Sequence, residues 1–501
     1  MRRVADDVLT VESMTQWQGD GRARAIVIGG GIAGLLAARV LAEHYAEVLV
    51  LDRDVEPGPG IRRRGVPQTF HLHQMLPRGE QVLERLLPGF LDDVLRLGAF
   101  PLADATLTWT NRYGTMATPS PEKGAFYSRG LVEQAIRDRV RAIANVRFGY
   151  EQQVVDLVAA GDGARITGVR CRAGGAPGAS ATLTADLVVD ASGRSSKLPQ
   201  WLSQLGYQAP PDETVSSGIG YSTRYYRVPR DRATVPALVV IENDYRAGNP
   251  AGGVLKRIED DVWSACLSGI GGQYPPVDAA GFDAGLTELI SPAMAEALCG
   301  AEPLTAPRGF RIPVCVRRHY EQMTRWPAGL LVLGDAMSTV DPIYGQGMTV
   351  AAIQAEALAE YLAEEHGPGG ELDMLRRLQR SSYPAWWLSA LEDLRWPGVE
   401  HRGGSAFARI PLLHKYFDLA LERMTEQFAG DGTAFDPTFL TFFAMTGLIA
   451  TPADVVHETM LKALLNGADT DAQRALRAEL ATYGDEIGTV LAEAVAFGAQ
   501  H

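Results

Sequence analysis

The first residues whose spacing suggests chemistry are three glycines near the start of the chain and the aspartate that follows them. Gly29, Gly31 and Gly34 come after an apolar run, and Asp52 ends the next such run. Glycine at these positions permits a tight turn and brings a pyrophosphate close to the amides of a helix N-terminus. The pattern predicts a dinucleotide site, with Asp52 on the adenosine ribose; the alternative is that the glycines serve turn geometry only. The expected contacts are Gly29, Gly31, Ala33, Gly34, Asp52 and Arg53.

A second pattern lies far along the chain. Gly334 and Asp335 follow an apolar run, and Gly345, Gly347 and Met348 open an Ala-rich segment. An aspartate after a buried strand can bind a cofactor hydroxyl, and glycines that open a helix can offer amides to a flavin ring. The first pattern fits either NAD or FAD as the cofactor. The second pattern favours FAD, because its glycines could offer amides to a flavin ring. We expect cofactor contacts from Gly334, Asp335, Gly345, Gly347 and Met348, with Pro342, Gly345 and Gly347 beside the flavin ring.

The segments around these patterns indicate an α/β fold. Residues 25–28 and 48–51 are short apolar runs that flank an Ala- and Leu-rich segment over 32–46, which predicts strand, helix, strand. Apolar residues alternate in much of 215–325, which predicts a larger antiparallel sheet, and the chain beyond Gly370 is typical of helices. We therefore predict a Rossmann-like FAD-binding domain, interleaved with an antiparallel β-sheet substrate domain and followed by a C-terminal helical region.

These segments divide the chain into four expected regions. Residues 1–23 form a flexible N-terminal extension, since they lack the apolar run of a signal peptide. The expected boundaries of the others are 24–110, 125–205 and 326–365 for the FAD-binding domain, 111–124 and 206–325 for the substrate domain, and 366–501 for the helical region.

Composition excludes several classes of protein. The chain has 501 residues, of which 46% are hydrophobic and 21% charged, as in globular proteins with large cores. A net charge of -13 argues against nucleic acid as a partner. The four cysteines form no CxxC pair, and no run of apolar residues is long enough to span a membrane. We expect a cytoplasmic protein without membrane insertion.

Both patterns resemble those of the FAD-dependent aromatic hydroxylase superfamily, the p-hydroxybenzoate hydroxylase-like monooxygenases. That superfamily has an Asp-Gly pair after a strand, which contacts FAD and reduced nicotinamide. Here the strand ends Asp190-Ala191-Ser192-Gly193, a form that resembles geranylgeranyl reductases and one bacterial monooxygenase branch. The resemblance implies that Asp190 contacts the cofactor and that Arg129 binds the FAD phosphates, the alternative being an exposed arginine. It also implies NADPH or NADH as electron source, used directly or through a separate flavin reductase.

Within the superfamily the sequence most resembles the bacterial polyether-pathway flavin epoxidases. The resemblance covers roughly residues 25 to 360 and rests on 64–68, 220–224, 272–276 and 344–348. It implies that the arginines at 62 to 64, with Arg64 as the candidate, lie in a loop beside the flavin, which we call the flavin loop. The alternative is that these arginines form a cluster exposed to solvent. His71 and His73 follow this loop without a third ligand, so we expect no metal site. Non-covalent FAD is the prediction, with attachment through a histidine as the alternative.

The resulting hypothesis is an FAD-dependent monooxygenase. It would transfer one oxygen atom of O2 from a flavin C4a-hydroperoxide to an apolar small molecule, such as a polyketide of antibiotic biosynthesis, by epoxidation or hydroxylation. The protein would then need no nucleophile, and no acidic residue of the sheet region stands out as a base for a phenol. The alternatives are a flavin-dependent reductase of prenyl or olefinic double bonds and a non-catalytic flavoprotein that binds a metabolite. No GxSxG elbow or WxWxIP motif supports a hydrolase or a flavin halogenase.

Overall fold

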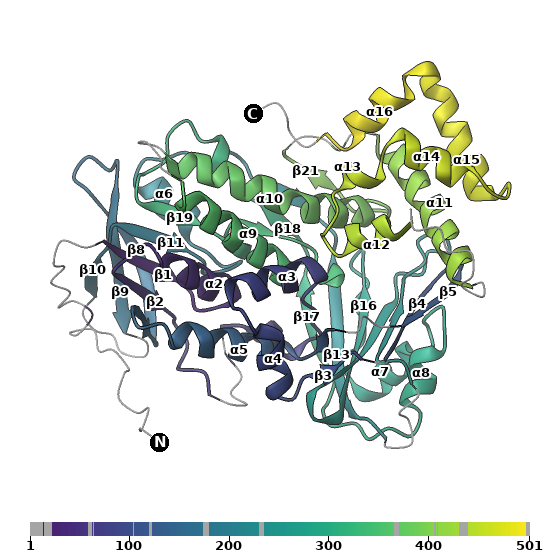
Figure 1. Ribbon diagram of the computed structural model, residues 1–501, viewed down its shortest axis with the longest axis horizontal. Helices are drawn as coiled ribbons and strands as arrows, with labels where there is room; N and C mark the ends of the chain where they lie inside the picture. The colour runs from purple at the N-terminus through teal and green to yellow at the C-terminus, as the bar shows by residue number, and fades with distance from the viewer. Residues whose placement is uncertain are drawn as a thin grey trace.

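A computed structural model gives the arrangement of most of the chain (Figure 1). The residues that it describes are 14, 23–58, 63, 65–103, 105–119, 123–173, 180–229, 235–364, 370–404, 407, 409–429 and 439–496. Arg64 and most of the expected N-terminal extension lie outside these residues. The predicted α/β class is confirmed, with two large sheets and a helical C-terminal region.

A parallel sheet of five strands forms the core of the first half of the molecule. Its strands are, in spatial order, β19 (Leu330–Val332), β11 (Leu187–Asp190), β1 (Arg24–Ile28), β2 (Glu47–Leu51) and β7 (Val146–Gly149). β1 and β11 are buried along their whole length, as expected of parallel strands covered on both faces. The sheet therefore places the ends of β1, β2, β11 and β19 along one edge, where both glycine patterns follow.

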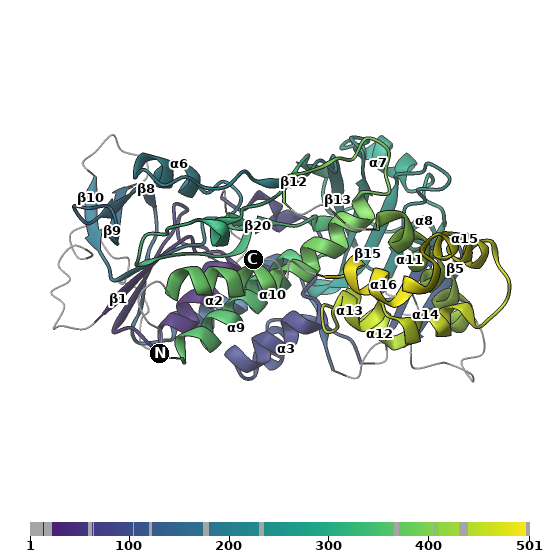
Figure 2. The same cartoon turned by 90° about the horizontal axis from the view of Figure 1, so that it is seen from above.

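Helices cover one face of this sheet, and a small antiparallel sheet covers the other (Figure 2). The helical layer consists of α2 (Ile32–Leu41), α5 (Arg129–Arg141), α9 (Gly347–Leu362) and α10 (Gly370–Asp393), while α3 (Pro77–Leu86) packs on α9 and α4 (Phe90–Arg96) packs on α5. The small sheet has β8 (Gln152–Ala159), β9 (Ile166–Ala173) and β10 (Ala181–Thr184), followed by α6 (Leu198–Gln204). Between β2 and α3 the described part of the chain forms a 3-10 turn, η1 (Pro67–Phe70).

A seven-stranded sheet forms the second half. Its order is β17 (Arg308–Ile312), β13 (Ile219–Arg227), β16 (Val262–Gly269), β15 (Gly252–Ile258), β14 (Leu238–Ile241), β4 (Thr106–Asn111) and β5 (Gly114–Pro119). All neighbouring strands of this sheet are antiparallel except β14 and β4, which are parallel. These two strands come from distant parts of the chain, so no hairpin fixes their relative direction. The expected domain boundary between residues 110 and 111 is wrong, since it falls inside β4. The β4–β5 hairpin belongs entirely to this sheet.

The two faces of the large sheet have different environments. On one face, the side chains of paired residues in β14, β15 and β16 pack on α7 (Ala279–Gly285) and α8 (Ala293–Leu298). On the other face, the side chains of the adjacent paired residues line a cavity. The helix-facing row is Val239, Leu255 and Ala265, and the cavity-facing row is Val240, Val254 and Cys266. Alternation with a period of two thus assigns each residue of these strands to a face.

The C-terminal region packs as helices on the edge of the large sheet (Figure 1). Beyond α10 it contains α11 (Ile410–Ala429), α12 (Leu440–Thr446), α13 (Pro452–Val455), α14 (Glu458–Leu465), α15 (Asp471–Leu480) and α16 (Ile487–Ala494). The expectation of helices alone is incomplete, because β21 (His401–Arg402) adds a strand to β12 (Glu213–Val215) in a small sheet with β18 (Cys315–Arg317) and β20 (Ser338–Thr339).

One buried carboxylate joins this small sheet to α10. Glu213 accepts hydrogen bonds from His319 (3.0 Å), His401 (2.8 Å), Arg317 (3.1 Å) and the indole of Trp386 (3.1 Å). Burial raises the pKa of Glu213, but its hydrogen bonds with the two histidines and the charge of Arg317 outweigh burial and lower the pKa to about 2. Burial lowers the pKa of His319, but its hydrogen bonds to carboxylates outweigh burial and raise the pKa to about 9.

The raised pKa of His319 predicts a pH dependence of stability. The protonated His319 contributes stability that is fully present below its unfolded pKa of about 6.5 and is lost as the pH rises through about 9. H319Q, which keeps a donor but does not titrate, should lack this contribution. We expect the difference in thermal midpoint between wild type and H319Q to shrink between those pH values. A difference that stays constant over this range would contradict the assignment.

Candidate functional site

A single large cavity connects the two halves of the molecule. It has a volume of about 1090 Å³ and runs from the end of β1, past the loop before α9, to the large sheet and the C-terminal helices. It brings together most of the residues expected at the cofactor: Gly29, Gly31, Ala33, Asp52, Arg53, Arg129, Gly334, Asp335, Pro342, Gly345, Gly347 and Met348. The two patterns therefore line one site, of a size that suits a large cofactor together with a ligand.

Each glycine of the first turn has a distinct steric role. Gly29 adopts φ +103°, which favours glycine, and a Cβ on Gly34 would lie 1.8 Å from the carbonyl oxygen of Gly29. Gly34 does not line the cavity but lets α2 approach β1. Around Gly31, by contrast, no atom lies within 4 Å of a built Cβ, and its φ of −79° suits any residue. Gly31 thus leaves open the space in which a pyrophosphate is expected at the N-terminus of α2.

This difference predicts opposite outcomes for two alanine variants. G31A should fold normally but lose most of its bound dinucleotide, because the new methyl group occupies the open space beside the helix N-terminus. G34A should destabilise the fold itself, since its Cβ meets backbone. Circular dichroism and thermal unfolding of the two variants, with flavin content measured after denaturation, separate the effects. A G31A protein with full flavin content would show that this space is not used.

The two patterns touch each other. A Cβ on Gly334 would lie 2.8 Å from the Cβ of Ala33, so the turn after β19 packs directly on the first turn of α2. Gly334 has φ +63°, and its amide donates to Gln354 on α9 at 2.6 Å. The small residues at both positions are therefore required by backbone packing as well as by cofactor approach.

An ionic network surrounds Asp52. Its carboxylate accepts from the amides of Gly30 and Asp54, both at 2.9 Å, and forms an ion pair with Arg63. Arg63 also pairs with Glu133, which in turn binds Arg129 and Arg137. The charges of Arg129, Arg63 and Arg137 outweigh the effect of burial and lower the pKa of Glu133 to about 2. Three guanidinium groups thus share one buried carboxylate beside the expected phosphates, and two of them, Arg63 and Arg129, reach the cavity.

Glu133 was not among the residues expected from the sequence, and Arg63 was expected only as a member of the run at 62–64. The arginine run at 62–64 was a usable signal, but it did not indicate which arginine turns inward. Glu133 had no signal, because a glutamate on a helix is normally solvated.

The flavin end of the cavity has an aspartate free of protein partners. The side chain of Asp335 faces the cavity, and no hydrogen bond joins it to any other described residue. Burial raises its pKa, while the positive charges of Arg129 and Arg194 oppose this. Nearby, Gly345 adopts φ +67°, and Gly347 opens α9 with no atom within 4 Å of a built Cβ. The site thus offers a free acceptor and an open helix N-terminus, which fit a ribityl hydroxyl and the anionic edge of a flavin ring.

Asp190 does not behave as the resemblance implies. It is fully buried, accepts hydrogen bonds from the amide of Ser192 (2.9 Å) and from Ser196 (2.5 Å), and lies outside the cavity lining. Its carboxylate thus caps its own loop. The following residues, including Arg194, line the cavity instead, and Arg194 is exposed with its guanidinium 5.4 Å from the ring of Phe310.

Of the two histidines of the flavin loop, His73 lines the cavity and His71 does not. His71 hydrogen-bonds Thr223 at 3.0 Å, whereas His73 lines the cavity and hydrogen-bonds the carbonyl oxygen of His71. Burial lowers the pKa of His71 to about 4 and that of His73 to about 3, so both are neutral at pH 7. Within the described ranges, no three histidine, cysteine or acidic side chains gather as a metal site would require.

Lys256 holds this loop against the large sheet, a role that the sequence did not reveal. Its buried amine donates to the carbonyl oxygens of His73 and Tyr127 and to the side-chain oxygen of Gln74. Burial lowers its pKa to about 7. Lys256 comes from the cavity face of β15, so it ties this loop to the large sheet.

Comparison with known proteins agrees with this site. Residues 25–197 match the family model of FAD-dependent oxidoreductases. Protein Rv3254 of Mycobacterium tuberculosis is 32% identical over 396 residues, which cover 76% of this chain and 82% of that protein. The chain belongs to the FAD-dependent oxidoreductases. Squalene epoxidase erg1 of Aspergillus fumigatus is 24% identical over 362 residues, with 69% of this chain and 67% of that protein covered.

The fold of this FAD-dependent oxidoreductase is that of flavoprotein monooxygenases. The structure of p-nitrophenol 4-monooxygenase PnpA from Pseudomonas putida superposes with a TM-score of 0.57 at 17% identity, over 84% of this chain and 98% of that one. Among the described residues, no helix has the length and hydropathy needed to cross a membrane.

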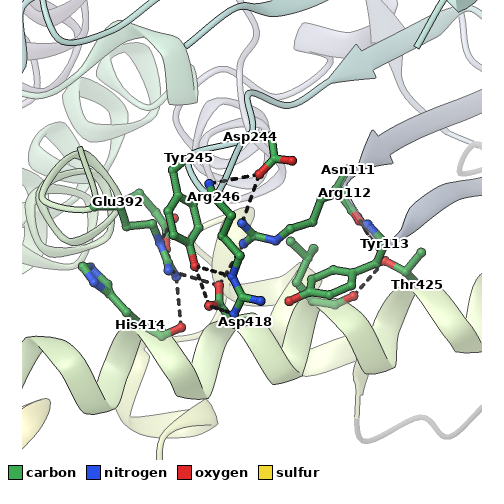
Figure 3. Close-up of polar contacts among 12 residues, drawn as sticks. Asn111, Arg112, Tyr113, Asp244, Tyr245, Arg246, Glu392, His414, Asp418 and Thr425 are labelled. Atoms are coloured by element: carbon green, nitrogen blue, oxygen red, sulfur yellow. Dashed lines mark hydrogen bonds and ion pairs between the residues drawn. The ribbon is translucent and has the colours of Figure 1, made fainter. Parts of the chain in front are cut away.

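Beyond the flavin end, the far wall of the cavity comes from the C-terminal helices and is mostly apolar. Its side chains from α11 and α12 are Phe417, Ala420, Leu421, Met424, Phe442, Phe443 and Met445. This wall is held to the large sheet by Asp418, which pairs with Arg112, Arg246 and Arg395 and accepts a hydrogen bond from Tyr245 at 2.5 Å (Figure 3). The positive charges and Tyr245 outweigh burial and lower the pKa of Asp418.

Removal of the charge of Asp418 should loosen this wall. D418N leaves three arginines around a neutral side chain, and loss of one member of a buried ion pair costs about 3 kcal/mol. We expect a lower thermal midpoint and faster proteolysis of the C-terminal helices, with little change in flavin content. D471N, at an exposed carboxylate of α15, provides the control. Equal proteolysis rates of D418N and D471N would show that the cluster does not fix the helices.

Proposed function

We propose that this FAD-dependent oxidoreductase is a monooxygenase that inserts one oxygen atom from O2 into an apolar small molecule. The observation that carries the proposal is the continuity of the cavity from the residues that fit FAD to the apolar wall on α11 and α12. A ligand seated there would face the flavin ring between this apolar wall and the charge-balanced cluster around Asp418. The similarity to squalene epoxidase erg1, an enzyme named for oxidation of an apolar olefin, supports the same chemistry.

The residues present would hold FAD along the edge of the parallel sheet. Gly31 and the N-terminus of α2 would receive the pyrophosphate, Asp52 the ribose, and Asp335 a ribityl hydroxyl. The open N-terminus of α9 at Gly347 would place its positive dipole at the ring. Bound FAD would supply the redox chemistry, in which NADH or NADPH provides two electrons, one oxygen atom of O2 enters the product and the other leaves as water.

The chain itself would orient the ligand and exclude water. The cavity-facing row of the large sheet and the apolar side chains of α11 and α12 enclose the space opposite the flavin end. Water exclusion strengthens the fixed dipoles that act on the ring and suppresses wasteful side reactions. No nucleophilic side chain is required for this reaction, which agrees with the absence of a triad pattern in the sequence.

The proposal predicts a transient flavin species on oxidation. Purified enzyme is reduced under argon and mixed rapidly with oxygenated buffer, with and without an apolar olefin such as squalene. We expect absorbance distinct from both reduced and oxidised flavin before reoxidation, and label from 18O2 in the product. Direct return to oxidised flavin with every olefin, and no label in any product, would contradict a monooxygenase.

Asp335 provides a test of the cofactor assignment. D335A removes the one carboxylate that faces the flavin end without a protein partner, and the loss of one such hydrogen bond corresponds to roughly a tenfold weaker Kd for FAD. Flavin content after purification and fluorescence titration with FAD measure the change. D138A, on the exposed face of α5, is the matched control. Equal FAD affinity of the two variants would show that Asp335 does not bind the cofactor.

A second candidate is a flavin-dependent reductase of olefinic double bonds. The loop that starts at Asp190 favours it, because Asp190 caps this loop rather than facing the cavity, in a form that resembles such reductases. Anaerobic turnover with a saturated product distinguishes it, since a monooxygenase requires O2.

A further inference from the structure

An acidic side chain of the ligand compartment plays no part in the arrangement described above. Glu242 follows the last residue of β14 and lines the cavity. The indole of Trp109 donates to its Oε1 at 2.5 Å, and its backbone amide donates to Thr110 at 2.9 Å, so the side chain is fixed at its base. No described residue donates a hydrogen bond to its other oxygen, Oε2, and the side chain faces the cavity.

The cations near Glu242 are already paired. Arg112 binds Asp418 and Asp244, and Arg395 binds Asp418 and Glu392 (Figure 3). The charges of this cluster balance without Glu242, since its three arginines match its three carboxylates. The members are Arg112, Arg246 and Arg395 with Asp244, Glu392 and Asp418.

Burial therefore dominates the ionisation of Glu242. Burial raises its pKa to about 7, and the hydrogen bond from Trp109 opposes the shift. Glu392 raises the pKa further, while Arg112 and Arg395 lower it. Near neutral pH much of the population carries a proton, so Glu242 can donate as well as accept a hydrogen bond.

We propose that Glu242 is a specificity-determining residue, which hydrogen-bonds a neutral hydroxyl or carbonyl group of an otherwise apolar ligand and disfavours ligands that carry a carboxylate. The geometry supports this assignment because Oε2 is a free polar group in a compartment whose opposite wall is apolar. A ligand carboxylate would meet no unpaired cation of the Asp418 cluster and would be repelled by ionised Glu242. The inference rests on the proposed function only in treating this end of the cavity as the ligand compartment.

The test is a binding measurement with three probes of the same shape. Oxidised, FAD-loaded enzyme is titrated by calorimetry with naphthalene, 2-naphthol and 2-naphthoate. We expect 2-naphthol to bind roughly tenfold more tightly than naphthalene, since one buried hydrogen bond to an acid is worth about that factor. From about pH 6 to about pH 8, 2-naphthoate should lose affinity as Glu242 ionises through a pKa of about 7.

Two variants separate the hydrogen bond from the charge. E242L, of similar size, should bind 2-naphthol and naphthalene within about twofold of each other, because the polar partner is gone. E242Q should keep the preference for 2-naphthol but lose the pH dependence of 2-naphthoate binding. E302Q, at an exposed glutamate far from the cavity lining, should behave as wild type.

Several outcomes would overturn the proposal. In the first, wild-type enzyme binds 2-naphthol no more tightly than naphthalene. In the second, E242L keeps the full preference for 2-naphthol over naphthalene. In the third, wild-type enzyme binds 2-naphthoate more tightly than the other two probes. The measurement uses no reductant, so failure of oxygen insertion would not change it. Conversely, loss of the 2-naphthol preference would leave the monooxygenase proposal untouched, and the two can fail separately.

Discussion

The structure depends on three close approaches of backbone at the end of β1. Gly34 lies against the carbonyl oxygen of Gly29, Gly29 lies against that of Ala191, and Gly334 lies against Ala33. At none of the three glycines can a larger residue fit without movement of backbone or of Ala33. These contacts fix α2, the loop after β11 and the turn after β19 relative to one another. The residues of three distant segments that are expected at the cofactor are therefore held relative to one another by the fold itself.

Buried charge is the second constraint on the site. Around the expected phosphates, Glu133 pairs with three arginines, and around the far wall Asp418 does the same. In both places two further carboxylates complete the balance, Asp52 and Asp54 in the first and Asp244 and Glu392 in the second. Near Asp52 the open N-terminus of α2, rather than a net side-chain charge, suits an anion. Near Asp418 the arginines are neutralised, which suits an uncharged ligand.

The sequence was sufficient for features set by local backbone geometry. Gly29 and Gly334 stand at tight turns after strands, which demand glycine, Gly31 has the spacing of a dinucleotide site, and the period of two in 215–325 indicated the large sheet. The structure brings these residues together in one cavity, but the role of each in binding stays a prediction. Features set by distant packing had no such signal. Asp190 turns to its own loop, and Glu242 becomes notable only because the fold brings α11 and α12, more than 150 residues away in the chain, to the same cavity.

The order of strands in the two sheets has a consequence for the synthesis of the protein. β4 and β5 leave the nucleotide-binding half early, and β4 pairs with β14, which is made much later. β1 and β2 likewise wait for β11, and β19 completes their sheet only after all strands of the large one. The large sheet cannot close before residue 312 is made, and the parallel sheet cannot close before residue 332, so the nascent chain holds unpaired strand edges for a long interval. Such edges stay open to aggregation during elongation for longer than in a chain whose domains are consecutive.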